Sequence, residues 1–553
     1  MANEDGSLQL VCNGEIYNAP ELREHLQAKG HVFSSGSDNE VILHGYKEWG
    51  EGVVGRLEGM FAFVLWDETN KKLFAARDRL GIKPLAMARA NGGIALASEI
   101  TAFHHLRNVV GTLKVAPQAL AYYLTLGYVP SPMSIYAGVE KLEAAQSLSW
   151  SPGSEPRLHT YWQPPEDVNS SSAADDQAKS LADWSGMFHT TLHQHLQSDV
   201  PIGLFLSGGL DSSSIALGLK DRARDLNALT VGYTNSAHDE SPIARAVTEQ
   251  LGYHHSVVPL GVADVLGLLD ETMGHFDEPF AFGANLSMIQ ICKAAAQQFK
   301  VVLSGDGGDE VLGGYNWHRQ VDGPGRLPGL KALRAGMVSF SRRGLSPPAR
   351  SFAERVFARR SPLHRHIVRL GLRFLPEQAE ALLAPMGVRF TEEDLLAPFE
   401  RHFVPRLPTR RALQRVDLMN FCADVILPKV DRSSMKFGLE VRVPFLDRRI
   451  VEWGISRPDD PRENETGKII LREYIEKELP KSVLDHPKQG FSLRVMDRFD
   501  WKEAKRRVLS GSIVEKGWIR KDVGDFVNEN SPRGTQGLWL LLSLDVWVKA
   551  HLS

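Results

Sequence analysis

The sequence predicts two domains of different fold class: an α+β domain with antiparallel strands, then an α/β domain with a parallel sheet and a helical C-terminal part. The chain has 553 residues, which is more than one ordinary hydrophobic core accommodates. Near the start, short apolar runs are separated by polar turns, as in β-hairpins. In the second half, continuous apolar runs alternate with helix-compatible stretches, which is typical of buried parallel strands.

The first domain is expected to span residues 1–162. The run LQLVCNGEI at 8–16 is apolar and ends in a polar Asn-Gly, and two apolar runs separated by a polar stretch form a hairpin signal. Amphipathic patterns indicate helices. Strands are expected at 8–16, 60–66, 73–77 and 94–97, and helices at about 20–29 and 39–48.

The second domain is expected to span residues 181–553, after a linker at 163–180 that is rich in Pro, Ser and Asp. Its apolar strand runs lie at 202–206, 228–233 and 300–303. Residues 323–365 are rich in Gly, Pro and Arg and are expected to form a helical insertion with loops. From residue 410 onward the pattern is mostly helical.

Composition excludes several classes of protein. Hydrophobic residues make up 43% and charged residues 24% of the chain, which excludes a disordered tail, a collagen-like fibre and a coiled-coil rod. The net charge of −3 gives no electrostatic footprint for nucleic acid. We find no secretory signal and no apolar run long enough to span a membrane, so we expect a cytoplasmic protein with no membrane partner. The three cysteines lack the spacing of a disulfide framework or a zinc site.

A Gly-rich loop directly follows the strand at 202–206. It reads Ser207-Gly208-Gly209-Leu210-Asp211-Ser212-Ser213 and opens a helix. Glycines let the backbone approach an anion, and helix-start N–H groups with Ser hydroxyls donate to phosphate oxygens. Asp211 repels phosphate but can hold Mg²⁺. The loop lacks the Gly-Lys-Ser/Thr of a Walker loop. An ordinary Gly-rich turn is the alternative.

A second such loop follows the strand at 300–303 and reads Ser304-Gly305-Asp306-Gly307-Gly308-Asp309-Glu310. Because the carboxyl ends of parallel strands share one edge of a sheet, both loops are expected to face one crevice. Neighbouring carboxylates repel each other unless a cation engages them. A solvated acidic turn is the alternative interpretation.

Two further segments are weaker signals by themselves. One runs from Val430 to Asp447, where VDRSSM leads into LEVRVPFLD. The other is Pro487-Lys488-Gln489-Gly490-Phe491, in which a Lys precedes a Gly-aromatic loop. Such a Lys can bring a compact cation to a phosphate or to a developing oxyanion.

Taken in order, these motifs closely resemble the asparagine synthetase family. The matching segments are SGGLDSS, the FDEP at 276–279, SGDGGDEVLGGY, KVDRSSM, LEVRVPFLD and PKQGF, with NGEIYN at 13–18, SDNEVI at 37–42, LEGMFAF at 57–63 and RDR with GIKPL at 77–85. The resemblance covers nearly the whole chain. It implies an α+β amidotransferase domain of the N-terminal-nucleophile type followed by an α/β ATP-pyrophosphatase domain.

The resemblance implies ATP and Mg²⁺, with an acceptor acid, aspartate first, activated as an acyl-adenylate and then attacked by ammonia or an amine. Asp211 and Asp309 resemble the family's Mg²⁺ ligands, and Asp306 would orient the nitrogen nucleophile or take its proton. Lys488 resembles the Lys that stabilises charge on the adenylate and pyrophosphate. The nucleotide-binding positions are Leu206, Ser207, Gly208, Gly209, Asp211, Ser212, Val231, Gly232, Ser304 and Gly305. A homodimer is a further possibility.

The first domain departs from the family pattern. Family members with glutaminase activity begin Met-Cys-Gly, whereas this chain begins Met1-Ala2-Asn3, and its NGEIYN motif starts at residue 13. Half of a glutamine site remains, at Asn13, Gly14, Glu15 and Asp38. Cys12 is expected to be a strand residue. We therefore expect a shortened domain without glutaminase activity, whether the sequence starts at an internal Met of a longer product or the protein has lost half of this site.

Two other departures bear on the substrate. Phe280-Ala281-Phe282-Gly283-Ala284-Asn285 follows FDEP where the family often has a second Asp and a Pro, and 142–147 lacks the usual Pro-Pro-Gly. Three hypotheses remain: an asparagine synthetase, an amide-forming or β-lactam-synthetase-like enzyme on another acid, and a non-catalytic scaffold. The intact SGGLDSS, Asp309 and Lys488 argue against the scaffold.

Overall fold

The computed structural model describes residues 1–90, 92–168, 177–221, 226–233, 239–260, 265–319, 361–486, 499–527 and 532–552. The expected insertion at 323–365 therefore lies almost entirely outside the described residues, and so does the PKQGF segment with Lys488.

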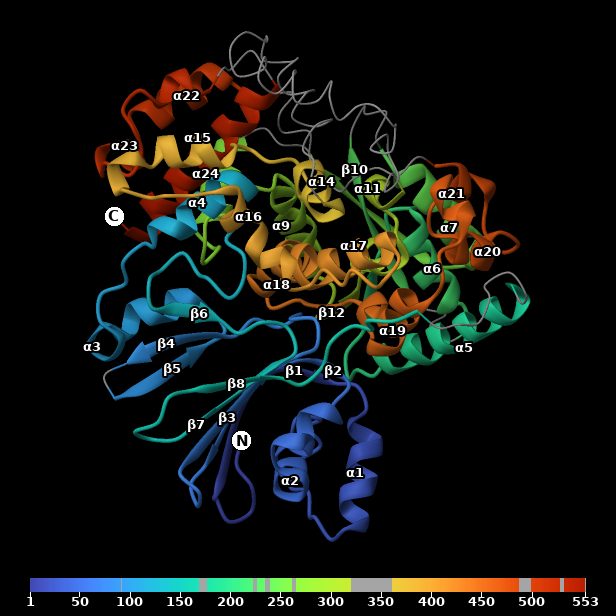
Figure 1. Ribbon diagram of the computed structural model, residues 1–553. Coiled ribbons are helices and arrows are strands. Elements are labelled where there is room, and N and C mark those ends of the chain that lie inside the picture. The colour runs from blue at the N-terminus through green and yellow to red at the C-terminus, as the bar shows by residue number, and fades with distance from the viewer. Residues whose placement is uncertain are drawn as a thin grey trace.

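The N-terminal domain contains two antiparallel sheets (Figure 1). The five-stranded sheet has the order β1-β2-β3-β7-β8 and the three-stranded sheet the order β5-β4-β6. The strands are β1 (Leu8–Ile16), β2 (Gly59–Asp67), β3 (Lys72–Arg77), β4 (Ala86–Ala90), β5 (Gly93–Ala97), β6 (Val139–Lys141), β7 (Gln146–Trp150) and β8 (Arg157–Thr160). All the predicted strands of this domain are present, so its α+β class is confirmed.

Side-chain alternation explains how these sheets are layered. One face of the larger sheet packs against helices α1 (Ala19–Ala28) and α2 (Glu40–Trp49), which were both predicted. The opposite face packs against the smaller sheet through residues such as Ala75, Met87 and Leu148. The resulting order of layers is helices, large sheet, small sheet.

The second domain has a five-stranded sheet in which every strand pair is parallel, as predicted. Its order is β11-β10-β9-β12-β13. The strands are β9 (Ile202–Phe205), β10 (Asn227–Tyr233), β11 (His254–Leu260), β12 (Val301–Leu303) and β13 (Glu440–Arg442). Strands β11 and β13 were not predicted. Strand β13 is only three residues long. In the chain it is separated from β12 by a region that contains many helices.

Helices cover both faces of the parallel sheet. On one face lie α5 (Gln177–His195), α6 (Leu210–Gly218) and α7 (Ser241–Leu251), and on the other α9 (Ala284–Ala295) and α18 (Leu427–Met435). Helix α5 begins at Gln177, within the stretch 163–180 that was predicted to be a linker. The Ser- and Asp-rich composition hid the start of a helix whose later turns bury Trp184 and Phe188.

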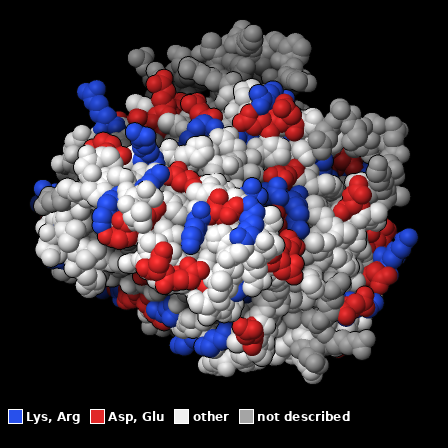
Figure 2. Space-filling model, turned by 90° about the horizontal axis from the view of Figure 1, so that it is seen from below, with Lys and Arg blue, Asp and Glu red and all other residues white. Residues whose placement is uncertain are grey.

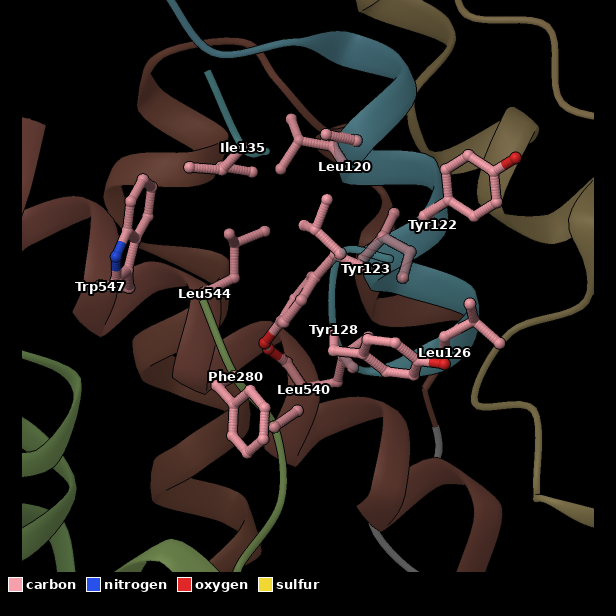
Figure 3. Packing of buried hydrophobic residues seen from close by; sticks show 14 of the residues in the cluster. Leu120, Tyr122, Tyr123, Leu126, Tyr128, Ile135, Phe280, Leu540, Leu544 and Trp547 are labelled. Carbon is pink, nitrogen blue, oxygen red and sulfur yellow. The ribbon is translucent and has the colours of Figure 1, made fainter. Parts of the chain in front are cut away.

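The C-terminal part is helical, as predicted. Its helices are α14 (Pro362–Arg369), α15 (Pro376–Leu382), α16 (Glu392–Glu400), α17 (Thr409–Asp417), α19 (Arg448–Ser456), α20 (Ile469–Ile475), α21 (Lys481–Asp485), α22 (Trp501–Leu509), α23 (Ser512–Glu515) and α24 (Pro532–Leu552). Helix α4 (Pro117–Leu126), although early in the chain, packs into this region: Tyr123 lies among Leu540, Leu544 and Phe280 (Figure 3), and its hydroxyl donates to the carbonyl oxygen of Leu540. The two halves of the molecule thus share a hydrophobic core.

Acidic and basic side chains are interspersed on the face of the molecule shown in Figure 2, as the small net charge implies. Among the described residues, no helix combines the length and the apolar character that a membrane crossing requires.

Candidate active site

The loop between β9 and α6 forms the start of an anion site. Gly208 has φ +77°, and a Cβ at this position would lie 3.0 Å from Ile243, so a glycine is required here. Ser207 N donates to Ser212 Oγ at 3.2 Å, and the two Ser hydroxyl oxygens also lie 3.2 Å apart. The loop therefore gathers hydroxyl groups and helix-start N–H groups, the donors that bind phosphate.

The second loop, between β12 and the short helix α10 (Gly308–Leu312), packs directly on the first. A Cβ at Gly305 would lie 2.9 Å from the Cβ of Asp211, and one at Gly308 would lie 2.6 Å from Asp211 Oδ1. These contacts follow from the pairing of β9 with β12 as parallel neighbours. Asp211 and Asp309, which were predicted to hold Mg²⁺ together, therefore lie close to each other where the two loops meet.

Lys468 lies between these two aspartates and pairs with both. It was not among the residues predicted from the sequence. Its Nζ lies 2.6 and 2.5 Å from the two carboxylate oxygens of Asp211 and 2.6 Å from Asp309 Oδ1. Burial alone would lower the pKa of Lys468, but the two carboxylates raise it above its ordinary value, so the ammonium is retained. Lys468 precedes α20 in a left-handed conformation (φ +47°). The only sequence signal was the Gly467-Lys468 pair before an apolar helix.

Asp306 lies in the second loop with two hydrogen-bond donors. Ser304 Oγ donates to Asp306 Oδ2 at 2.5 Å, and Lys429 Nζ of α18 donates to Asp306 Oδ1 at 3.1 Å. The Lys429 side chain is buried. Lys429 belongs to the KVDRSSM motif, but nothing in that motif pointed to a contact with Asp306. The pair fixes the orientation of this carboxylate beside the phosphate loop.

Leu206, Val231 and Gly232, the positions predicted to contact adenosine, lie together at the carboxyl ends of β9 and β10. Leu206 N donates to Leu229 O at 2.9 Å, and Thr230 Oγ1 donates to Leu206 O at 2.6 Å. A Cβ at Gly232 would lie 2.6 Å from Val257, so the strand end requires a glycine. The strand ends beside the phosphate loop thus bring these three positions together.

Mg²⁺ fits the two aspartates by the chemistry of the donor set. Carboxylate oxygens are hard ligands, and Mg²⁺ is commonly bound by one or two carboxylates together with substrate phosphates. Within the described parts of the chain, no cluster of three His, Cys, Asp or Glu side chains could hold a metal by itself. In this structure the ammonium group of Lys468 lies against both carboxylates.

The residues of the predicted glutamine site also lie together, in the N-terminal domain. Asn13, Gly14 and Glu15 are consecutive on β1, and Asp38 Oδ2 accepts a hydrogen bond from Ile16 N at 2.7 Å. Burial, with Glu440 and Asp38 nearby, raises the pKa of Glu15 to about 7. Burial also raises the pKa of Asp38. This site holds excess negative charge.

Cys12 is a strand residue, as expected. Its Sγ donates to Asn39 Oδ1 at 3.1 Å. Burial and then the nearby Asp38 and Glu15 raise the pKa of the thiol to about 12, so it is protonated at neutral pH.

Comparison with known proteins agrees with this geometry. The asparagine synthase family model matches residues 184–549, and the glutamine amidotransferase domain model matches residues 1–162. Asparagine synthetase (glutamine-hydrolyzing) 1 of Bacillus subtilis strain 168 is 28% identical over 99% of this chain and 86% of its own length. A putative asparagine synthetase (glutamine-hydrolyzing) of Mycobacterium tuberculosis H37Rv is 33% identical over 97% of this chain and 84% of its own.

Among solved structures, the glutamine phosphoribosylpyrophosphate amidotransferase of B. subtilis aligns with 46% of this chain and 63% of its own. Its identity of 16% and TM-score of 0.22 are too low to carry an argument. The fold, the paired loops and the family matches define a ligase that forms carbon–nitrogen bonds by ATP-dependent amide synthesis. The chain belongs to the asparagine synthetase family, with an N-terminal glutamine amidotransferase domain.

Proposed function

We propose that this protein makes asparagine from aspartate, ATP and ammonia, with AMP and pyrophosphate as the other products. The observation that carries the proposal is the position of Lys468, a buried cation held between Asp211 and Asp309 where the two Gly-rich loops meet. A cation between two carboxylates, beside a loop rich in N–H donors, suits a triphosphate and its leaving group.

In the first step, an oxygen of the aspartate side-chain carboxylate attacks the α-phosphorus of ATP. The bond from the α-phosphorus to the oxygen shared with the β-phosphate breaks, and pyrophosphate leaves with that electron pair. Ser207, Ser212 and the N–H groups at the start of α6 would hold the phosphates. Lys468 would pair with the charge that develops on the leaving group.

Asp211 and Asp309 would hold Mg²⁺, which neutralises phosphate charge when it is bound. The chain's own share of this work is to hold the Asp211 side chain against the second loop, where Gly305 and Gly308 leave room for it.

In the second step, ammonia attacks the carbonyl carbon of the acyl-adenylate. The bond from that carbon to the AMP oxygen breaks, AMP leaves, and the new C–N group loses one proton. Asp306 would take this proton or orient the nitrogen. Lys429 and Ser304 hold Asp306 from two sides, so its carboxylate enters the reaction already positioned.

We propose that the nitrogen comes from free ammonia and that these 553 residues do not hydrolyse glutamine. Cys12 is the only cysteine of the N-terminal domain. Its thiol is protonated, lies within a strand and donates to Asn39. A thiol without thiolate character is a poor nucleophile.

A second candidate function, amide formation on a bulkier or less polar acid, is favoured by the segment after FDEP. The Phe282 ring packs 5.1 Å from that of Phe280 and 6.3 Å from that of Phe421. Asn285, at the start of α9, is fully buried, and its side-chain amide has no hydrogen-bond partner among the described residues. An amide buried in this way is costly unless a partner arrives.

Pyrophosphate release from ATP tests both candidates. With aspartate and ammonium, we expect pyrophosphate to form together with asparagine. Release with another acid and none with aspartate supports the second candidate, and no release with any acid rejects both. Asp211→Asn keeps the shape of the side chain, and we expect it to abolish release.

A further inference from the structure

Buried side chains of the N-terminal domain form hydrogen bonds with one long helix of the second domain. Helix α17, the π-helical segment Leu418–Ile426 and α18 follow one another without a break. A π-helical stretch is rare and is frequently found at functional sites. The contacts are Tyr128 Oη to Asn420 Oδ1 (2.7 Å), Ser131 N and Oγ to Asp424 (2.9 and 2.6 Å) and Lys83 Nζ to Asp431 Oδ1 (3.0 Å). Asn420, Asp424 and Asp431 are all buried.

Lys83 stands on a rigid loop. The carboxylate of Asp78 accepts hydrogen bonds from the backbone N–H groups of Leu80, Ile82 and Lys83 at 3.1, 2.9 and 2.9 Å. The Arg77 guanidinium donates to the carbonyl oxygen of Lys83 at 2.8 Å. This loop is the RDR and GIKPL segment of the sequence. Its internal bonds fix the backbone from which Lys83 reaches the second domain.

The ion pair between Lys83 and Asp431 is sealed from water. The side chains are 3% and 9% exposed. Burial works to lower the pKa of Lys83, but the carboxylate of Asp431 outweighs it and raises that pKa. Removing one partner of such a pair leaves a buried charge uncompensated. The contact is therefore a firm link between the two domains.

The same helix carries the partner of the proposed catalytic carboxylate. Lys429, which donates to Asp306, is two residues before Asp431 in α18. At 100° per residue, positions i and i+2 project about 200° apart, on nearly opposite sides of a helix. One side of α18 is thus bound to the N-terminal domain and the other holds Asp306.

We propose that Lys83 is a positioning residue for amide formation, which it supports through Asp431, helix α18 and Lys429 by setting the place of Asp306. The inference rests on the proposed function, because it takes the second reaction step to need Asp306. It assigns the amidotransferase domain a task that does not depend on glutamine hydrolysis. A shift of α18 moves Lys429, and Asp306 then loses one of its two donors. Misplacement by about 1 Å costs an enzyme on the order of a hundredfold in rate.

The two half-reactions of the full-length enzyme separate this role from a structural one. Aspartate-dependent exchange of labelled pyrophosphate into ATP reports adenylation, and asparagine formation at saturating ammonium reports amidation. For Lys83→Met we expect amidation to fall about tenfold to a hundredfold while exchange stays close to wild type. Lys83→Arg keeps the charge and should restore most of the amidation. Glu58→Gln removes a different pair across the domains, with Arg448 at 2.8 Å, and should leave both rates unchanged.

An equal fall of exchange and amidation in Lys83→Met, or no fall in either, overturns the inference. An amidation loss in Glu58→Gln as large as in Lys83→Met overturns it too. If Lys83→Met does not fold, Asp431→Asn breaks the same pair from the side of α18 and must show the same selective loss. A wild-type enzyme without any acid-dependent exchange contradicts the proposed function itself, which makes the two failures distinguishable.

Discussion

The two sites of this molecule compensate their buried charge in opposite ways. In the second domain every proposed catalytic carboxylate has a lysine: Lys468 joins Asp211 and Asp309, and Lys429 joins Asp306. In the N-terminal domain Glu15 lies near Asp38 and Glu440, while Arg442 is 3.6 Å away and, with Lys83, only partly offsets their charge. The first arrangement suits phosphates and a metal ion. The second carries negative charge that a ligand ammonium group would neutralise.

Among substitutions of basic residues, loss of the central cation should have the largest effect. We expect Lys468→Met to reduce pyrophosphate release by about 10² to 10³, because one preorganised charge beside the leaving group is lost. Lys71→Met, which removes an exposed lysine paired with Glu68, is the matched control. A Lys468→Met variant that folds and releases pyrophosphate at the wild-type rate would remove Lys468 from the mechanism.

The next largest effect is expected for Asp306, and it concerns amide formation alone. We expect Asp306→Asn to lower amide formation by about 10² or more, because a neutral amide cannot take the proton that nitrogen loses. Adenylation, measured by pyrophosphate exchange, should remain. Equal loss in both half-reactions would contradict the role of Asp306 in amidation.

A smaller, pH-dependent effect tests the N-terminal site. The pKa of Glu15 is raised to about 7, so this carboxyl is mostly neutral at pH 6 and mostly ionised at pH 8. Only the ionised form attracts an α-ammonium group, so glutamine binding should strengthen with rising pH, by about tenfold between pH 6 and pH 8. Calorimetric titration measures this. Glu15→Gln should flatten the dependence, and an unchanged dependence would show that another group titrates.

For substitution of Cys12 we expect no effect on glutamine hydrolysis. With a thiol pKa of about 12, Cys12 is thiolate to roughly one part in 10⁵ at pH 7. Cys12→Ser should therefore leave the release of glutamate from glutamine unchanged. A decrease in that release on substitution would make Cys12 a nucleophile.

The sequence was most informative where one strand leads directly into one loop. The runs at 202–206 and 300–303, each followed by Ser-Gly, predicted β9, β12 and the meeting of their loops, because parallel neighbours share an edge. Lys468 could not be found this way: it lies 257 positions from Asp211, and only the tertiary fold brings the two together.

Other misses have similar physical causes. The three residues of β13 are too few for a periodic pattern, and the pairing of Lys429 with Asp306 depends on how α18 packs. The start of α5 was hidden by a polar composition that is typical of linkers. In each case a contact distant in sequence decided the local structure.

The most direct test of the central claim is the identity of the phosphorus products. The purified protein is incubated with ATP, Mg²⁺, aspartate and ammonium, and the products are followed by ³¹P NMR and amino-acid analysis. We predict AMP and pyrophosphate in equal amounts, matched by asparagine, and none of the three with Asp211→Asn. Formation of ADP and phosphate, or of asparagine without pyrophosphate, would contradict the account.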